Sequence, residues 1–134
     1  TYKKLSDAEL YDYVADRLID AGVVGWFSGR SEFGPRALGG RSILADPRRN
    51  DAKDLLNAKI KRRESFRPFA PSILKEYVSE YFELSEVVPF MEKVFPIKKE
   101  MQSLIPAVTH VDGTGRLQSV DAGVSTRYYA LIDA

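Results

Sequence analysis

The segment VVGWFSGRSEFGPRALGGRSILA, residues 23–45, places a loop rich in glycine and arginine between two short apolar runs. The runs VVGWF (23–27) and RSILA (41–45) are each typical of a strand, the first of a buried one. The loop, GRSEFGPRALGGRS (29–42), holds three arginines, four glycines and one proline, a composition that disfavours a regular helix. The arginine guanidinium is permanently charged and carries several N–H donors in one plane. The composition of the loop therefore predicts either a site that binds an oxyanion or an exposed segment whose arginines are solvated.

Length and composition limit the classes of protein that this chain can belong to. Its 134 residues, 44% hydrophobic and 29% charged, are typical of one soluble globular domain, which we place at 1–134. The chain has no cysteine, which excludes disulfides, a catalytic thiol and thiolate metal ligands. Its one histidine, His110, argues against an all-protein zinc site. No membrane-length apolar run or signal-peptide pattern is present, so a cytoplasmic location is the default expectation.

Positive charge is concentrated in one part of the chain, although the formal net charge is only +1. Residues 30–67 hold eleven of the 20 lysines and arginines and five of the 19 aspartates and glutamates, a local charge of +6. The other residues hold nine basic and fourteen acidic side chains, a local charge of −5. A general nucleic-acid binder is usually basic over its whole domain. The pattern therefore favours one focused anion site on an otherwise acidic body.

Turn and periodicity signals predict an alternation of helices and strands. Ser6 and Glu9 form a capping-box pattern that opens a helix, and Gly22 ends it. A second helix is predicted from 50 to about 60, with Ala52, Leu55, Leu56 and Ile60 on its inner face. An extended stretch then runs into a strand near 72–74. The remaining predicted elements are a short helix at 76–82, a strand at 91–97, a β-hairpin in 107–120 around Asp112-Gly113, and a helix at 127–132. This order predicts an α+β domain with one mixed, twisted sheet.

Five residues are candidates for binding an anion, and each has a purely structural alternative. Arg36 lies in the glycine-rich loop, and Lys61 lies at a helix C-terminus, where a cation also complements the helix dipole. Arg67 precedes a proline and should have extended backbone. Arg116 follows the predicted hairpin turn, and His110 precedes it, where it can equally be a hydrogen-bonded strand histidine. From the residues alone, the sequence supports an anion-binding α+β domain.

Three long stretches resemble the C-terminal domain of the O-carbamoyltransferase family, which includes nodulation-factor and antibiotic-tailoring enzymes. They are GRSEFGPRALGGRSILADPR (29–48), LNAKIKRRESFRPFAPSIL (56–74) and PAVTHVDGTGRLQSV (106–120). With their connectors they cover about residues 23 to 120, in the family's order. Ser31 replaces the family's usual methionine and Gly40 its usual asparagine, and neither change removes a charge.

The resemblance implies a YrdC-like fold, a twisted α/β sheet with a concave basic surface. It implies that the domain binds carbamoyl phosphate and ATP, with Mg²⁺ accompanying ATP, and forms carbamoyl-adenylate. The family's metal site lies in a separate N-terminal domain, which passes the carbamoyl group to a hydroxyl acceptor and is the implied partner. The family's catalytic and anion-binding cations correspond to Arg36, Lys61, Arg67 and Arg116, and we add His110 to the nucleotide-binding set.

Two other functions remain open from the sequence. One is an RNA-binding YrdC-like module without carbamoyl transfer, which would need aromatic side chains among its cations; Phe33, Phe66 and Phe69 are candidates. The other is a regulatory or structural domain that binds an anion without turnover. Because the charge pattern favours a focused site, nucleic acid is not the expected partner, and no membrane partner is expected either.

The resemblance also suggests that the chain is a fragment. It stops at RYYALIDA (127–134), where family sequences continue into a strand and a loop that completes the anion pocket. We therefore expect weak ligand binding, no turnover by the chain alone, and association into a homodimer through an unpaired sheet edge.

Overall fold

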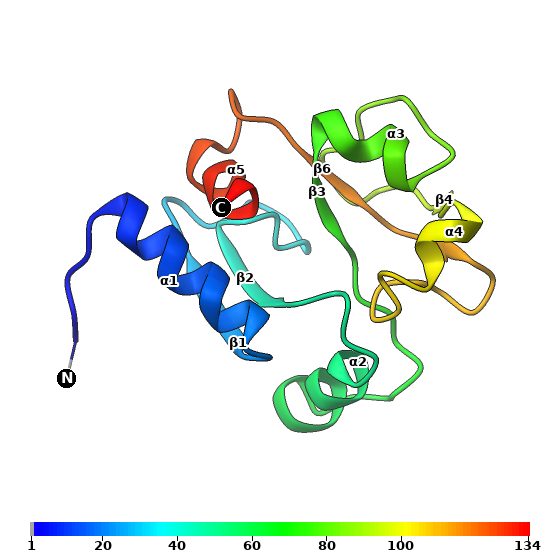
Figure 1. Cartoon of the computed structure of the whole chain (residues 1–134), viewed down its shortest axis with the longest axis horizontal. Helices are drawn as coiled ribbons and strands as arrows, with labels where there is room; N and C mark the ends of the chain where they lie inside the picture. Colours follow the sequence, from blue (N-terminus) through cyan, green and yellow to red (C-terminus); the bar gives the residue numbers. More distant parts are fainter. Residues whose placement is uncertain (1) are drawn as a thin grey trace. The chain divides into compact units, whose positions relative to one another are not determined.

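The computed structural model describes residues 2–134 and contains two compact units (Figure 1). Unit 1 combines the described part of Thr1–Ala45 with Asp121–Ala134, and unit 2 is Asp46–Val120. Both units mix helices with small sheets, so the predicted α+β class is confirmed. The single domain placed at 1–134 stays a prediction.

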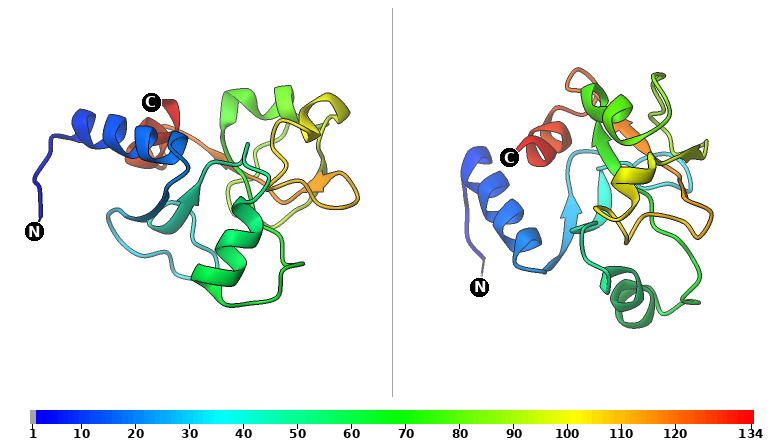
Figure 2. Two further views of the ribbon diagram at one scale, coloured as in Figure 1. Left: turned by 60° about the horizontal axis from the view of Figure 1, so that its bottom comes forward. Right: turned by 45° about the vertical axis from the view of Figure 1, so that its right-hand side comes forward.

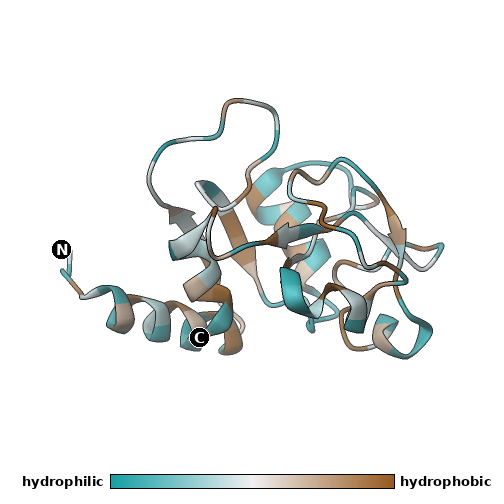
Figure 3. Cartoon of the chain, turned by 90° about the horizontal axis from the view of Figure 1, so that it is seen from above, coloured by the Kyte–Doolittle hydropathy of each residue, from teal (hydrophilic) through white to brown (hydrophobic). Residues whose placement is uncertain are grey.

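The first helix of unit 1, α1 (Asp7–Ile19), begins at the predicted capping box. The backbone N–H of Ser6 donates to Glu9 Oε2 at 2.9 Å, and the N–H of Glu9 donates to Ser6 Oγ at 3.4 Å, so two otherwise unpaired donors are satisfied. The helix ends at Ile19, before the predicted stop at Gly22, and the positive φ of 65° that follows it falls on Ala21. Figure 3 shows hydrophilic and hydrophobic segments alternating along α1, as in an amphipathic helix.

The two strands predicted around the glycine-rich loop are confirmed as β1 (Val23–Phe27) and β2 (Arg41–Ala45). They pair antiparallel, with Val23 opposite Ala45 and Phe27 opposite Arg41. The expectation that all of β1 is buried is wrong: Trp26 is buried but Phe27 is 69% exposed, because successive side chains alternate between the two faces of the strand. The predicted C-terminal helix is α5 (Thr126–Asp133), which packs against α1 (Figure 1).

Unit 2 contains short elements joined by long turns (Figure 2). The helix predicted from 50 to about 60 is observed as α2 (Ala52–Leu55) continued by a π-helix, η1 (Leu56–Lys61). The other elements are β3 (Ser72–Leu74), the 3₁₀-helix η2 (Lys75–Tyr77), α3 (Val78–Tyr81), β4 (Phe95–Pro96), α4 (Lys99–Gln102), β5 (Thr114–Gly115) and β6 (Gln118–Val120). Strands β3 and β6 pair parallel, and β4 pairs antiparallel with β5.

The strand pairing differs from the prediction in two ways. The expected single mixed sheet is replaced by three separate two-stranded sheets. The expected hairpin in 107–120 is wrong, because its first arm forms no strand and its second arm is divided between β5 and β6, which have different partners. The turn itself does form: His110 N–H donates to Thr114 O at 2.8 Å, and Gly113 N–H donates to His110 O at 3.0 Å. The first arm is irregular because residues 106–108 form turns, in which Val108 N–H donates to Ile105 O at 3.2 Å instead of to a neighbouring strand.

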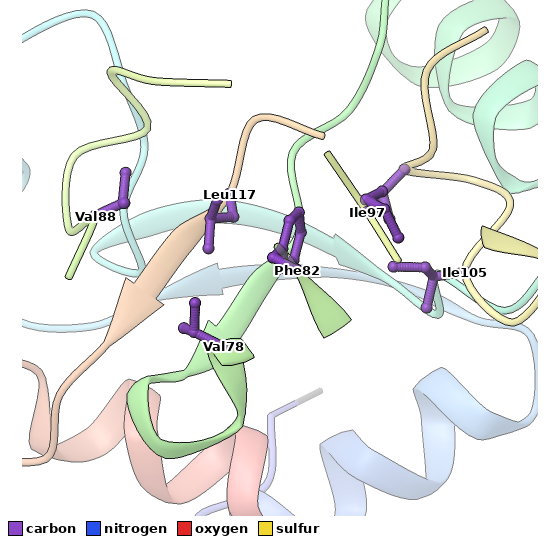
Figure 4. Close-up of a cluster of buried hydrophobic side chains, with 7 residues drawn as sticks. Val78, Phe82, Val88, Ile97, Ile105 and Leu117 are labelled. Atoms are coloured by element: carbon purple, nitrogen blue, oxygen red, sulfur yellow. The ribbon is translucent and has the colours of Figure 1, made fainter. Parts of the chain in front are cut away.

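The hydrophobic core of unit 2 consists of seven buried side chains (Figure 4). Its members are Val78, Phe82, Val88, Ile97, Ile105, Val108 and Leu117. They come from α3, from the turns that follow it and from the segment between β5 and β6, so the core holds together parts of the chain with little regular structure. Burial of these side chains fixes the ends of the turns that carry His110 and Arg116.

A glycine in the loop between β1 and β2 should be essential for the fold of unit 1. Gly39 has a φ of 102°, and a Cβ there would overlap the buried ring of Tyr128 on α5. We therefore expect Gly39→Ala to lower the free energy of unfolding by about 1–3 kcal/mol in urea denaturation. The matched control is Gly25→Ala, where a Cβ meets no atom within 4 Å, and that change should stabilise the strand by about 0.5 kcal/mol or leave it unaltered. Equal effects of the two substitutions would contradict this packing.

Candidate anion-binding site

The glycine-rich loop is held in shape by one carboxylate, that of Glu32. Its Oε1 accepts hydrogen bonds from the backbone N–H of Leu38 at 2.7 Å and of Gly40 at 2.6 Å. Arg41 lies beside it, with Nε 3.5 Å from Glu32 Oε2, and its Nη2 donates to Glu32 O at 3.2 Å and to Gly34 O at 2.6 Å. Glu32 therefore orients a neighbouring arginine, and Arg41 serves the loop rather than a ligand.

Glu32 remains ionised because its hydrogen bonds outweigh its partial burial. Burial alone would raise the pKa of this carboxyl, but backbone N–H donors from Leu38, Glu32 itself and Gly40, together with the charge of Arg41, lower the pKa below its ordinary value. A Cβ at Gly40 would come within 2.8 Å of Arg30 O and 2.9 Å of Glu32 Oε1. The glycine at this position, where the resembled family usually has asparagine, thus lets the backbone approach the carboxylate closely.

The loop leaves two of its arginines available. Arg30 and Arg36 are exposed, and neither has a hydrogen-bond or ion-pair partner among residues 2–134. The cations that follow β2 differ, because they are paired locally: Arg48 binds the buried Asp46 with Nη2 at 2.6 Å from Oδ2, and Arg49 lies 2.7 Å from Asp51. Arg36 is therefore presented to solvent with its full set of N–H donors.

A buried amide organises the second basic stretch. Asn57, on η1, is 1% exposed, and its Nδ2 donates to Ser65 O at 3.2 Å and to Arg67 O at 3.0 Å. Its Oδ1 accepts from Arg63 Nε at 2.8 Å. The π-helical turn brings the Asn57 side chain inward and leaves Ile60 48% exposed, which corrects the predicted inner face. Such π turns are frequent at functional sites.

The turn fixed by Asn57 carries two predicted site residues. Lys61 is the last residue of η1, is exposed, and has no partner within the described chain. Arg67 is also exposed; its Nε lies 2.8 Å from Glu64 Oε2, while its two terminal nitrogens contact no acceptor in residues 2–134. Arg63 is structural, because it binds Asn57 and lies 4.9 Å over the Phe69 ring.

The turn between α4 and β5 orients the single histidine. His110 Nδ1 lies 3.0 Å from Thr114 Oγ1, and the Thr114 hydroxyl donates to Asp112 Oδ1 at 2.7 Å. His110 Nε2 is buried and has no hydrogen-bond partner in the described residues. The pKa of His110 is lowered, first by burial and then by the positive charges of Arg116 and Lys53, while Asp112 acts in the opposite direction.

These interactions place three of the basic and titratable groups near one another in unit 2. Arg116 lies between β5 and β6, and its charge acts on His110, as does that of Lys53 on α2. A backbone hydrogen bond of 3.1 Å from Ala107 N to Pro47 O connects the two parts of the chain that carry them. Lys53 was missed by sequence reasoning, since one lysine on a helix gives no signal.

The predicted site residues are divided between the two units. Arg36 belongs to unit 1, whereas Lys61, Arg67, Arg116 and His110 belong to unit 2. The convergence of Arg36, Lys61, Arg67 and Arg116 on one pocket stays a prediction. Sequence reasoning also missed Asn57, whose one signal is a polar residue beside the buried Leu56 in an otherwise apolar helical pattern.

Metal ligands do not gather in the described chain: residues 2–134 contain no group of three or more His, Cys, Asp or Glu side chains that could hold an ion. The donors at the site are cationic or neutral, and therefore suit phosphate oxygens better than a metal ion. Within the same residues, no helix combines the length and apolar character needed to cross a membrane.

The sequence model of the family described as "Carbamoyltransferase C-terminus" matches residues 15–134. The chain therefore belongs to the carbamoyltransferase C-terminal family, and the resemblance seen in its motifs is confirmed.

Curated relatives from bacteria and archaea extend this match. The chain is 50% identical over 135 residues to nodulation protein NolNO of Sinorhizobium fredii, covering 96% of this chain and 20% of that protein. It is 51% identical over 123 residues to nodulation protein NolO of Bradyrhizobium diazoefficiens, and the match covers 90% of this chain and 22% of that protein. It is 39% identical over 137 residues to the uncharacterized protein MJ1058 of Methanocaldococcus jannaschii, and the match covers 96% of this chain and 22% of that protein. The chain thus spans about a fifth of the length of these relatives.

Removal of the Asn57 amide should loosen the turn that carries Lys61 and Arg67. Asn57→Ala leaves Ser65 O, Arg67 O and Arg63 Nε without their present partners, and we expect a loss of about 2–3 kcal/mol in unfolding free energy. The exposed Asn50 supplies the control: Asn50→Ala should change the stability by less than about 0.5 kcal/mol. If both variants unfold at the same urea concentration, Asn57 does not organise this turn.

The lowered pKa of His110 makes stability depend on pH in a defined direction. The unfolded chain takes up a proton on this histidine near its ordinary pKa of about 6.5, whereas the folded chain resists protonation. The free energy of unfolding should therefore fall as the pH decreases from 7.5 to 5.5, a range above the titration of the carboxylates. In His110→Gln this decrease should be smaller, as measured by urea denaturation at several pH values. An unaltered decrease would show that another group is responsible.

Proposed function

We propose that this chain is part of an ATP-dependent O-carbamoyltransferase, in which it binds carbamoyl phosphate and ATP to form carbamoyl-adenylate. Membership in the carbamoyltransferase C-terminal family supports the class of enzyme. The observation that carries the proposal is the presence of exposed, unpartnered cations, Arg36 and Lys61, on segments that the side chains of Glu32 and Asn57 hold in shape. Several neighbouring arginines, among them Arg41, Arg49 and Arg63, are engaged by groups of the chain itself, whereas Arg36 and Lys61 keep their donors for an anion.

The proposed substrates suit the side chains at the site. Carbamoyl phosphate and the phosphates of ATP concentrate negative charge on oxygens that an arginine can contact in pairs, while lysine acts as a movable point charge. As negative charge shifts to the leaving phosphate and pyrophosphate, Arg36, Lys61, Arg67 and Arg116 would stabilise it. Loss of one such preorganised donor typically costs about 3–4 kcal/mol in the transition state.

Arg67 would bind an anion while it keeps its ion pair with Glu64. Its Nε contacts Glu64, and its terminal nitrogens remain available as a pair of parallel donors. Glu64 thereby restricts the rotation of the guanidinium before a ligand arrives, so less side-chain entropy is lost on binding. We expect Mg²⁺ to accompany ATP, held by phosphates and water rather than by this chain's carboxylates.

Transfer of the carbamoyl group to its acceptor is the second half of the proposed reaction. Since the chain spans about a fifth of its relatives' length, we propose that transfer to a hydroxyl uses another part of a longer protein, working in the cytoplasm.

Exposed aromatic side chains favour one alternative, binding of single-stranded RNA. Phe33, in the loop that carries Arg36, is fully exposed, and Phe66, beside Arg67, is 74% exposed. Bases stack on such rings with little sequence preference. Binding of an unrelated single-stranded RNA that weakens steeply with salt, together with no affinity for carbamoyl phosphate, would favour this function over carbamoyl transfer.

Conversion of the site arginines to lysine should weaken ligand binding without unfolding the protein. Arg36→Lys and Arg67→Lys keep the charge but lose the paired contact, and we expect the Kd for carbamoyl phosphate to rise about ten-fold each in titration calorimetry. The control is Arg17→Lys on α1, because the Arg17 guanidinium contacts Tyr13 and lies outside the proposed site. This variant should bind carbamoyl phosphate with the Kd of the unaltered chain. Equal affinity in all variants would exclude both arginines from the site, and a large fall in Tm would indicate a structural role instead.

A further inference from the structure

His110 has a buried hydrogen-bonding atom that the protein itself does not use. Nε2 has no partner among residues 2–134, although the rest of the ring is fixed by the turn around it. An unpaired buried acceptor or donor is costly, and native proteins rarely retain one without a functional reason. The question is which chemical group Nε2 would bind.

The neighbouring hydrogen bonds determine which ring nitrogen carries the proton. Asp112 is ionised and can only accept, since the pKa of its carboxyl is lowered first by the hydrogen bond from the Thr114 side chain. The single hydroxyl proton of Thr114 is therefore donated to Asp112, and Thr114 Oγ1 must accept a proton from His110 Nδ1. With Nδ1 protonated in the neutral ring, Nε2 presents a lone pair.

The charges around the ring keep it neutral and select its ligand. Arg116 and Lys53 act on His110 from two different elements, and with burial they oppose a second proton on the ring, while Asp112 favours one. The same two cations would repel a positively charged donor such as an ammonium group. The ligand must therefore combine an N–H or O–H donor, directed at Nε2, with negative charge that lies near Arg116 and Lys53.

We infer that His110 Nε2 accepts a hydrogen bond from the amide N–H of the carbamoyl group and so selects carbamoyl phosphate over acyl phosphates. The inference rests on the proposed function and adds a specificity-determining residue to it. Carbamoyl phosphate carries both required features within one small molecule: an NH₂ group and anionic phosphate oxygens. Acetyl phosphate places a methyl group where the NH₂ stands, so it leaves Nε2 unpaired while the phosphate contacts stay the same.

The selection should be measurable as a ratio of affinities. A site built to bond an N–H rejects an analogue that lacks it, because its own polar atom is then buried without a partner. For one neutral hydrogen bond we expect the chain to bind carbamoyl phosphate about ten-fold more tightly than acetyl phosphate. Inorganic phosphate, which engages the cations alone, serves as the reference for binding without the carbamoyl contact.

Titration calorimetry of the three ligands against the chain and its variants tests the inference. His110→Phe, which keeps a ring but no acceptor, should lose the preference for carbamoyl phosphate, and His110→Gln, whose amide oxygen can accept, should retain part of it. Thr114→Val, which frees the ring from its fixed tautomer, should reduce the preference, whereas the matched control Thr114→Ser should preserve it. The two Thr114 variants keep the test valid if a change at His110 prevents folding.

Nitrogen NMR provides an independent readout, because His110 is the one histidine in the chain. In protein labelled with ¹⁵N-histidine, we expect a protonated Nδ1 and an unprotonated Nε2 at pH 7, and a change at Nε2 when carbamoyl phosphate is added but not when inorganic phosphate is added. A ring protonated at Nε2 would overturn the inference, as would an Nε2 signal that responds equally to both ligands.

The outcomes separate this inference from the proposed function. If the wild-type chain binds carbamoyl phosphate and acetyl phosphate equally well, or if His110→Phe keeps the preference, the role of His110 is wrong while the anion site stands. If the wild-type chain binds none of the three ligands, the proposed function fails and this inference fails with it. A preference lost in His110→Phe and Thr114→Val but kept in Thr114→Ser supports the inference.

Discussion

The pair of hydrogen bonds that Glu32 Oε1 accepts from Leu38 and Gly40 is the constraint on which the glycine-rich loop depends. A loop between two antiparallel strands has no ladder to satisfy its backbone, so its N–H groups need other acceptors. One carboxylate supplies them, and Arg41 balances its charge. Because Glu32, Arg41 and the Ser42 hydroxyl satisfy these backbone groups, the loop holds its shape without Arg36, which is exposed at the surface.

The same principle applies in unit 2, where single side chains replace regular secondary structure. The amide of Asn57 binds two carbonyl oxygens and one guanidinium across the turn after η1. Thr114 and Asp112 hold His110 in one tautomer across the turn before β5. In both places a polar side chain fixes a turn, and the turn carries a cation or an acceptor that we propose for ligand binding.

Basic residues close together in sequence therefore have different roles. Arg41, Arg48, Arg49 and Arg63 are engaged by groups of the chain itself. Arg36 and Lys61 are not engaged within the described residues, and Arg67 is engaged through Nε alone. The excess of positive charge in residues 30–67 is thus smaller in effect than its count suggests, because five of the eleven cations there contact nearby carboxylates or carbonyl oxygens. What remains is compatible with the focused anion site that the charge pattern indicated.

The sequence by itself determined the features that depend on neighbours along the chain. The capping box at Ser6, the strands β1 and β2, the C-terminal helix and the family motifs are all local patterns, and all were predicted. Only the tertiary structure decided which strands pair, because β5 and β6 take partners 18 or more residues away and no local pattern specifies them. It also decided that Asn57 is buried and that His110 Nε2 is left without a partner, since burial and partner choice depend on side chains brought together from distant parts of the sequence.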